Sequence, residues 1–216
     1  MITPHRTPFF LPLLFPSLLW RVPTKANELY LTFDDGPVTG PTEFALQALA
    51  TFSAKATFFC IGDNIRKHPD IFKRILMQGH AVGNHTFNHL NGWKNTVNHY
   101  IHNIKTCDTE MVKSLGTQKT TFITDLFRPP YGRITPKQIQ LLKSDYRIVM
   151  WDVLSVDYNK DLSPEACLRN TIRAARPGSI IVFHDSVKAE KNMTYALPRV
   201  LDHFTNEGFV FKSLHG

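Results

Sequence analysis

Short apolar runs alternate along the chain with longer stretches in which apolar residues recur every three or four positions. The short runs are rich in β-branched and aromatic residues and are bounded by glycine or proline, which is typical of buried strands. The longer stretches have the period of amphipathic helices, and several open with proline or with a capping box such as Thr135-Pro136-Lys137-Gln138. We predict strands at residues 28–35, 56–61, 80–84, 121–127, 147–153, 179–183 and 209–212, and helices at residues 41–52, 71–78, 97–115 and 195–205, with two more opening at Pro136 and Pro164.

This alternation, repeated about seven times, predicts an α/β fold with a parallel sheet covered by helices on both faces. Polar clusters follow the carboxyl ends of the predicted strands, where barrels and other parallel folds assemble active sites. Periodicity alone leaves open whether the sheet closes into a barrel.

The first predicted strand runs into two adjacent acids, Asp34 and Asp35, and Gly36-Pro37 then ends the pairing. Because the backbone can swing at a strand end, two consecutive carboxylates can take different roles around one point. The structural alternative is a turn that simply favours aspartate before glycine.

His85 and His89 are four residues apart, which predicts two imidazoles on one face of a helix. That spacing is used when two histidines share a metal ion, and Asp35 is the candidate for a third ligand.

The length of 216 residues and the 43% hydrophobic content allow one sizeable core, so we expect one domain. The three cysteines, Cys60, Cys107 and Cys167, are far apart and lack a C-x-x-C spacing. Neither a disulfide framework nor a thiolate zinc site is therefore indicated.

The formal net charge of +7 could favour an anionic partner, but Lys and Arg never run beyond pairs such as Arg66-Lys67. Without a basic block, we predict no nucleic-acid partner. The sequence makes no prediction of oligomeric state.

Residues 9–20 are strongly apolar but are interrupted by Pro12 and Pro16. They are too few for a membrane span of about 20 residues, and no small-residue cleavage site of a secretory signal follows them. We predict that residues 1–27 form an apolar strap packed on the remainder, residues 28–216, with a peripheral membrane contact through residues 9–20 as the alternative. The compartment stays open between cytoplasm and cell envelope.

Five strand ends carry motifs whose order and type resemble the polysaccharide deacetylases, family 4 of the carbohydrate esterases. The resemblance implies a distorted (β/α) barrel of about seven parallel strands. It also implies a catalytic domain at residues 28–216 that removes N-acetyl groups from N-acetylglucosamine-containing polysaccharides, such as peptidoglycan or chitin-like oligomers. A divalent metal, usually zinc, with cobalt, nickel or manganese as alternatives, is implied too. The motifs are Thr32-Phe33-Asp34-Asp35-Gly36, His85-Thr86-Phe87-Asn88-His89, Arg128-Pro129-Pro130-Tyr131-Gly132, Asp157-Tyr158 and Val182-Phe183-His184-Asp185.

The resemblance also implies a role for each matching residue. Two positions depart from the family's pattern: Tyr158 stands where tryptophan is common, and Val182 where leucine is common. Both lie at the wall of the acetyl pocket, so they bear on substrate choice. The implied roles are metal ligands for Asp35, His85 and His89, general base for Asp34, an arginine that holds the base for Arg128, an oxyanion donor for the backbone N–H of Tyr131, general acid for His184, and tuning of that acid for Asp157.

The chemistry explains why these residue types belong together. A carboxylate with a pKa of about 3.9 can deprotonate water of pKa about 15.7 only by climbing roughly 16 kcal/mol, whereas metal binding reduces that climb to roughly 4 kcal/mol. The amine leaving group needs a proton, and an imidazole titrates in the right range to supply one.

Two other functions remain open from the sequence. A closed pocket would favour hydrolysis of a small cyclic amide or ureide, while an open groove lined by Trp93, Tyr131 and Tyr158 would favour a glycan. A non-catalytic carbohydrate-binding protein would tolerate loss of the base or of a metal ligand, yet all of these residues are present.

Overall fold

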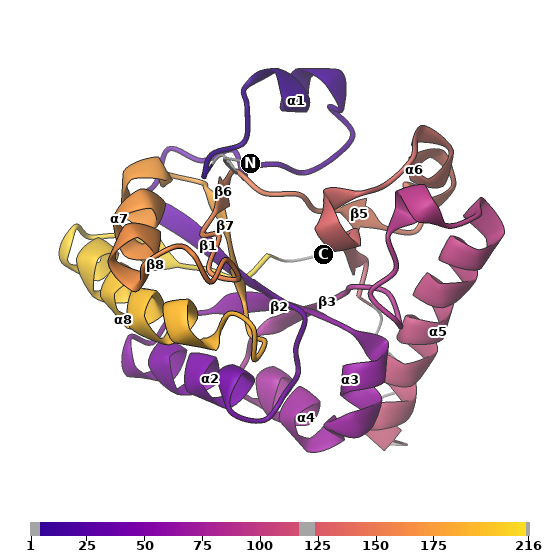
Figure 1. Ribbon diagram of the computed structural model, residues 1–216, viewed down its shortest axis with the longest axis horizontal. Coiled ribbons are helices and arrows are strands. Elements are labelled where there is room, and N and C mark those ends of the chain that lie inside the picture. The colour runs from indigo at the N-terminus through magenta and orange to yellow at the C-terminus, as the bar shows by residue number, and fades with distance from the viewer. Residues whose placement is uncertain (1–4, 117–123, 215–216) are drawn as a thin grey trace.

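The computed structural model describes residues 5–116 and 124–214, and Figure 1 shows their arrangement. Its centre is a sheet in the order β5-β4-β3-β2-β1-β7-β6, with β8 pairing with β1 outside that path. Every paired ladder is parallel. The strands are β1 (Glu28–Asp34), β2 (Ala56–Cys60), β3 (Ala81–Asn84), β4 (Leu126–Phe127), β5 (Arg147–Ile148), β6 (Val153–Leu154), β7 (Ile180–His184) and β8 (Val210–Phe211).

The two edge strands of this path, β5 and β6, are separated by only residues 149–152. This short crossover starts with the N–H of Val149 donating to Phe127 of β4, and ends with the N–H of Asp152 donating to Ile180 of β7. Between them, Met150 donates to Leu19 of the N-terminal segment. The sheet therefore curls, and the crossover runs from one edge strand to the other, which confirms the prediction of a distorted barrel of parallel strands.

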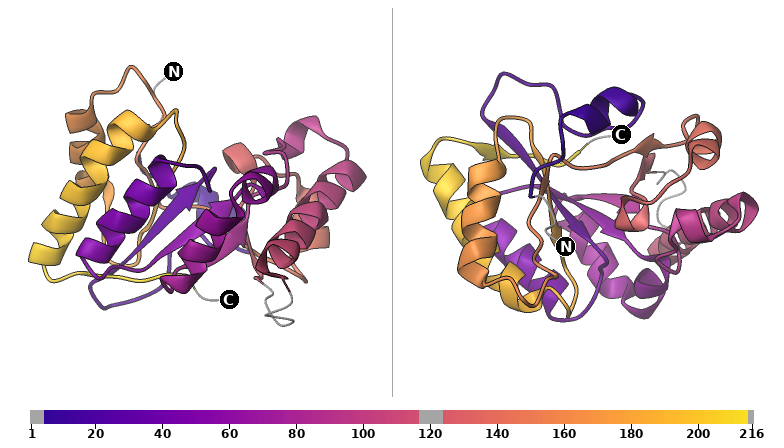
Figure 2. Two further views of the ribbon diagram at one scale, coloured as in Figure 1. Left: turned by 90° about the horizontal axis from the view of Figure 1, so that it is seen from below. Right: turned by 45° about the horizontal axis from the view of Figure 1, so that its top comes forward.

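Helices surround this sheet, as both views of Figure 2 show. Several begin as the sequence predicts: Thr135 caps α6 by accepting from the N–H of Gln138, and Ser163 caps α7 by accepting from the N–H of Ala166. The helices are α1 (Phe10–Leu14), α2 (Pro41–Thr51), α3 (Gly62–Lys67), α4 (Pro69–Met77), α5 (Val97–Leu115), α6 (Pro136–Leu142), α7 (Pro164–Ala174) and α8 (Glu190–Asn206), with 3₁₀ turns η1 (Gly92–Lys94) and η3 (Pro130–Gly132).

The main core lies between the sheet and helices α2, α4, α7 and α8. Phe33 of β1 stacks on Phe58 of β2 with ring centroids 4.8 Å apart, which locks the two central strands. The three cysteines, all among the described residues, are free and buried. A second cluster around Tyr100 and Phe127 packs the inner face of α5.

The structure corrects two predicted elements and adds a helix that was not predicted. The predicted strand 147–153 is two strands, because residues 149–152 bond to three different partners. Helix α8 begins at Glu190 rather than at residue 195: Met193 extends the apolar face by one turn, and the polar Asn192 is buried beside it, which interrupts the apolar pattern in the sequence. Helix α3 was not predicted. The predicted strand 121–127 falls partly outside the described residues, and its described part contains β4.

The N-terminal segment is fastened to the barrel at two places. Thr7 donates its N–H to Asp152, and Leu19 donates its N–H to Ile148, while the side chains of Leu18 and Trp20 are buried in the second cluster. Between these anchors the chain forms the short helix α1 (Figure 1). The boundary between an N-terminal strap, residues 1–27, and a catalytic domain, residues 28–216, stays a prediction. Within residues 5–116 and 124–214, no helix combines the length and the apolar content needed to cross a bilayer.

Candidate active site

The two acids at the end of β1 point to different partners. Asp34 is buried, and its Oδ1 lies 2.7 Å from a guanidinium nitrogen of Arg128. Asp35 has a φ of +87°, in the left-handed region, so the backbone turns sharply after the strand. Its carboxylate faces His85 and His89 instead. This single turn therefore points the two carboxylates in different directions, as the sequence suggested.

The segment from His85 to His89 is not a helix, so the predicted helical face is wrong. Thr86 and His89 have φ values of +63° and +56°, which no helix allows. The loop still brings the two imidazoles together, with ring centroids 5.1 Å apart.

Two asparagines outside the predicted set hold this loop. Asn84, which ends β3, accepts from the N–H of Thr86 at 2.7 Å. Asn103 of α5 accepts from the N–H groups of Phe87 and Asn88 at 2.9 and 3.0 Å. These side chains replace the backbone hydrogen bonds that a helix would supply. Asn84 sits next to the first histidine, which was the one signal in the sequence; nothing local marked Asn103.

Asp35, His85 and His89 form a cluster in which one ligand atom from each residue lies within 4.8 Å of the others. The Oδ1 atom of Asp35 lies 3.2 Å from Nε2 of His89 and 3.8 Å from Nε2 of His85. This buried oxygen makes no hydrogen bond within the described part of the chain. Burial would raise the pKa of Asp35, but the neighbouring histidines hold it well below its usual range.

His85 is oriented by the backbone. Its Nδ1 lies 2.8 Å from the carbonyl oxygen of Arg128, so Nδ1–H donates there and the lone pair of Nε2 faces Asp35. Burial lowers the pKa of His85 to about 4, which keeps the ring neutral near pH 7. A divalent cation of the zinc type binds ionised carboxylates and neutral imidazoles. Asp35 offers an ionised carboxylate with an unpaired buried oxygen, and His85 offers a neutral imidazole. The residues present therefore fit a metal ion.

Arg128 is fully buried and its guanidinium is satisfied by protein atoms. It donates to Asp34 and to Thr32 Oγ1, both at 2.7 Å, and to the carbonyl of Met150 at 2.9 Å. The guanidinium also lies over the ring of Phe59, 4.1 Å from its centroid. Asp34 is thus held in one orientation, one residue away from the cluster of Asp35 and the two histidines.

His184 ends β7 and pairs with Asp157. Its Nδ1 lies 2.7 Å from Oδ1 of Asp157, and its backbone N–H donates to Oδ2 at 2.7 Å. Burial alone would lower the pKa of His184, but the Asp157 carboxylate raises it to about 9. The ring is therefore protonated at neutral pH. The ring of Tyr158 stands edge-on to it at 5.0 Å.

The remaining predicted residues lie around this centre. Tyr131 is exposed, has a φ of +60°, and places its hydroxyl 3.1 Å from Nδ1 of His89. Its side chain therefore touches the cluster. Val182 is buried with Leu154 and Val156 in a small apolar group beside Tyr158.

A groove of about 340 Å³ extends from Tyr131 along the N-terminal segment. Its aromatic wall includes Tyr131 and Trp93, as the sequence suggested, and Trp151, which it did not. Tyr158 does not line this groove and stands by His184 instead. The lining residues are Thr7, Pro8, Leu11, Phe15, Leu18, Trp20, Trp93, Tyr131, Gly132, Arg133, Ile134, Ile139, Met150, Trp151 and Leu154.

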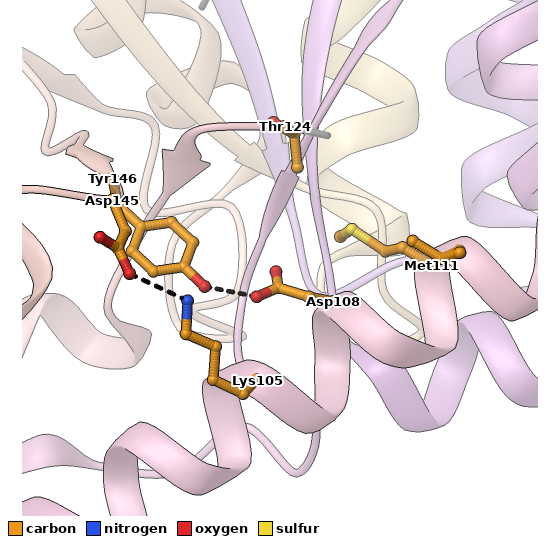
Figure 3. A pocket seen from close by; sticks show the side chains of 7 residues that line it. Lys105, Asp108, Met111, Thr124, Asp145 and Tyr146 are labelled. Carbon is orange, nitrogen blue, oxygen red and sulfur yellow. Dashed lines mark hydrogen bonds and ion pairs between the residues drawn. The ribbon is translucent and has the colours of Figure 1, made fainter. Parts of the chain in front are cut away.

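A separate pocket of about 290 Å³ lies behind the histidine loop, between α5 and the region of Tyr146 (Figure 3). Lys105 and Asp145 form an ion pair at 3.1 Å, and the hydroxyl of Tyr146 donates to Asp108. Asp108 also accepts from the side-chain amide of Asn84 at 2.7 Å. This polar chain therefore supports the residue that holds the histidine loop.

Comparisons with known proteins agree on one family. The model of the family described as polysaccharide deacetylase matches residues 21–147. A peptidoglycan-N-acetylglucosamine deacetylase of Bacillus cereus is 34% identical over 194 residues, which cover 89% of this chain and 68% of that protein. A chitooligosaccharide deacetylase of Azorhizobium caulinodans is 34% identical over 169 residues, covering 76% and 77%. Among solved structures, the Bc1960 peptidoglycan N-acetylglucosamine deacetylase superposes with a TM-score of 0.86 at 30% identity, covering 96% of this chain and 95% of that one.

Proposed function

This chain belongs to the polysaccharide deacetylase family, and we propose that its site removes N-acetyl groups from N-acetylglucosamine glycans of the peptidoglycan or chitin type. One observation carries the proposal. Asp34, fixed by Arg128, stands one residue from a carboxylate that converges with two histidines, and a protonated His184 adjoins β1 in the same sheet.

The metal site consists of Asp35, His85 and His89, with zinc as the first choice and cobalt, nickel or manganese as alternatives. The buried and unpaired Oδ1 of Asp35 supports this assignment, as does the orientation of His85 by the carbonyl of Arg128. When bound, the cation lowers the pKa of water and polarises a carbonyl oxygen.

Asp34 acts as the general base. The hydrogen bond from Arg128 keeps this carboxylate oriented, so that it accepts a proton from the attacking water. Arg128 is a positioning residue, since its guanidinium is buried and fully occupied by protein partners.

His184 acts as the general acid. Its protonated ring, held by Asp157 through Nδ1, donates a proton from Nε2 to the leaving nitrogen. The backbone N–H of Tyr131 stabilises the developing oxyanion, a contribution typically worth about 2.7 to 4 kcal/mol.

The open groove supports a glycan over a small cyclic amide. Trp93, Tyr131 and Trp151 line a hollow that is continuous with the surface and extends away from His89. A sugar chain can stack on such side chains, while a small ureide would leave most of the groove empty. Val182 and Tyr158, beside His184, form part of the acetyl pocket and adjust which acyl group fits.

The direct test is acetate release. The protein, freed of metal with a chelator, is incubated with chitooligosaccharides or peptidoglycan fragments, with and without added zinc or cobalt. We expect acetate from the metal-loaded protein and at least a hundredfold less from Asp34→Asn, by the usual contribution of a general base. Equal rates of release for the two proteins would refute Asp34 as the base, and no release by either would refute the deacetylase and favour a carbohydrate-binding role.

A further inference from the structure

Helix α1 and its two flanking residues, Phe9 and Phe15, present large apolar side chains to solvent. Phe9 is 82% exposed, Leu13 73% and Leu14 64%, and Phe10 and Phe15 are exposed as well. None of the residues of α1 is buried. Exposed apolar patches of this kind on a protein surface mark an interaction site.

This surface is held in place rather than being a loose end. On one side, Thr7 bonds to the backbone of both Trp151 and Asp152, and on the other the indole N–H of Trp20 donates to the carbonyl of Phe15 at 3.0 Å. Leu18 and Trp20 are buried in the core behind it. Figures 1 and 2 show α1 at the periphery of the molecule. Anchors on both sides therefore hold the largely exposed apolar residues 9–15, the apolar tip, in a fixed position.

The charged residues that flank this tip along the chain are basic. Residues 7–20 carry no charged side chain, and Arg6, Arg21 and Lys25 flank them. The first 27 residues contain no Asp or Glu, in a chain with a formal net charge of +7. Lys25 is exposed, and Arg6 is exposed while its guanidinium lies 3.7 Å from the carboxylate of Asp152. An apolar tip flanked by basic residues is complementary to an anionic lipid surface.

We propose that α1 docks this protein on an anionic membrane surface, with Phe9, Leu13 and Leu14 inserted among the lipids. A glycan is a poorer occupant of this tip, because Thr7 and Ser17 are the only polar side chains in residues 7–20, and sugars need hydrogen-bonding partners. A second copy of the chain would bring its own basic flank against this one, which like charges disfavour.

Docking in this way fixes where the reaction site lies. Leu11 and Phe15 of the same segment line the groove that leads to Tyr131. The groove would therefore open close to the lipid surface, and glycan near the membrane would be the accessible substrate. That consequence rests on the proposed function, whereas the docking itself does not.

Vesicle binding tests the docking directly. The full chain is sedimented with vesicles of phosphatidylcholine alone or of phosphatidylcholine with phosphatidylglycerol. We expect binding to the anionic vesicles that weakens with added salt. The triple variant Phe9→Ser, Leu13→Ser, Leu14→Ser, none of which lines the groove, should bind at least about tenfold more weakly.

The matched control is Met77→Ser with Val210→Ser, which removes two apolar side chains of comparable exposure, 78% and 56%, elsewhere on the surface. It should bind like the unaltered protein. If the triple variant fails to fold, Leu14→Asp alone places a charge in the same surface and should abolish binding. Acetate release from a soluble oligosaccharide should be unchanged in all of them, so a failed docking and a failed deacetylase are distinguishable.

Three results would overturn the docking. The first is that the unaltered protein leaves the anionic vesicles unbound, and the second is that the triple variant binds them equally well. The third is a dimer in light scattering that the triple variant dissociates, without vesicle binding by either protein, which would make α1 a self-association surface.

Discussion

The carboxylate of Asp185 accepts a hydrogen bond from the backbone N–H of Gly36 at 2.9 Å, and a second one from the hydroxyl of Thr42 at 2.6 Å. Asp185 is buried and directly follows His184, while Gly36 directly follows Asp35. Asp185, next to the proposed acid His184, therefore holds the turn that follows Asp34 and Asp35, the proposed base and metal ligand.

Gly36→Ala should disrupt this contact between Asp185 and the turn. A Cβ at residue 36 would lie 1.9 Å from Oδ2 of Asp185, so the turn or the carboxylate must move. Overpacking of this kind costs about 1 to 3 kcal/mol of unfolding free energy. We expect that loss in urea denaturation, together with weaker zinc binding by calorimetry.

Gly208→Ala is the matched control for that variant. Its φ is +75°, but no described atom lies within 4 Å of a Cβ placed there. It should cost about 1 kcal/mol through the backbone alone and leave zinc binding unchanged. Equal zinc affinity in both variants would show that Asp185 does not position the site.

Removing the charge of Arg128 should destabilise the fold. Arg128→Met leaves Asp34 buried without its ionic partner, which typically costs about 3 to 5 kcal/mol. The double variant Arg128→Met, Asp34→Asn removes both charges and should recover part of that loss. Urea denaturation of the unaltered protein, the single variant and the double variant measures the free energy of unfolding of each. A value for Arg128→Met within about 1 kcal/mol of that of the unaltered protein would contradict the expectation.

The titration of His184 should set the alkaline limb of the pH–activity profile. Because Asp157 raises the pKa of His184 to about 9, the acid is present below that pH and activity falls as pH rises through it. The folded pKa lies above the ordinary value of about 6.5, so the pair stabilises the fold fully below pH 6.5 and loses that contribution as pH rises through about 9.

Asp157→Asn should lower the pKa of His184, because burial then acts without the compensating carboxylate. The alkaline limb should move to lower pH, and an NMR titration of the His184 ring should move with it. Asp161→Asn, an exposed acid nearby, should leave both unchanged. An unaltered limb in Asp157→Asn would remove His184 from the role of acid.

Trp93→Ala should weaken the binding of long substrates. Trp93 is 59% exposed at the groove; the guanidinium of Arg133 lies 4.0 Å from its ring centroid, and its indole N–H donates to the carbonyl of Ile134 at 3.0 Å. Losing one aromatic stacking surface is worth about 0.5 to 1.5 kcal/mol, or roughly two- to tenfold in KM. Steady-state kinetics should show this rise for oligomers with kcat unchanged, and no rise at all would place the sugar elsewhere.

The sequence predicted the positions of the candidate residues best where a polar residue directly follows an apolar strand. Asp34, Asp35 and His184 stand at strand ends in the structure, since a parallel sheet brings its carboxyl ends to one edge. Arg128 follows β4 for the same reason, although only the structure shows that its guanidinium is completely buried.

The sequence failed where long-range contacts decide the backbone. The loop from His85 to His89 has the spacing of a helix, but Asn103 of α5 holds it in a conformation with positive φ that local preference disfavours. The crossover at residues 149–152 reads as a strand because it is apolar, yet its partner Leu19 is more than a hundred residues away. Neither contact leaves a local signal.

The anomalous diffraction of crystals grown with zinc, recorded at the zinc absorption edge, tests the central claim most directly. One peak is expected within coordination distance of Oδ1 of Asp35 and Nε2 of both His85 and His89, beside the carboxylate of Asp34. No peak between these three side chains, or a zinc ion bound elsewhere while they stay empty, would contradict the proposed metal-dependent hydrolysis.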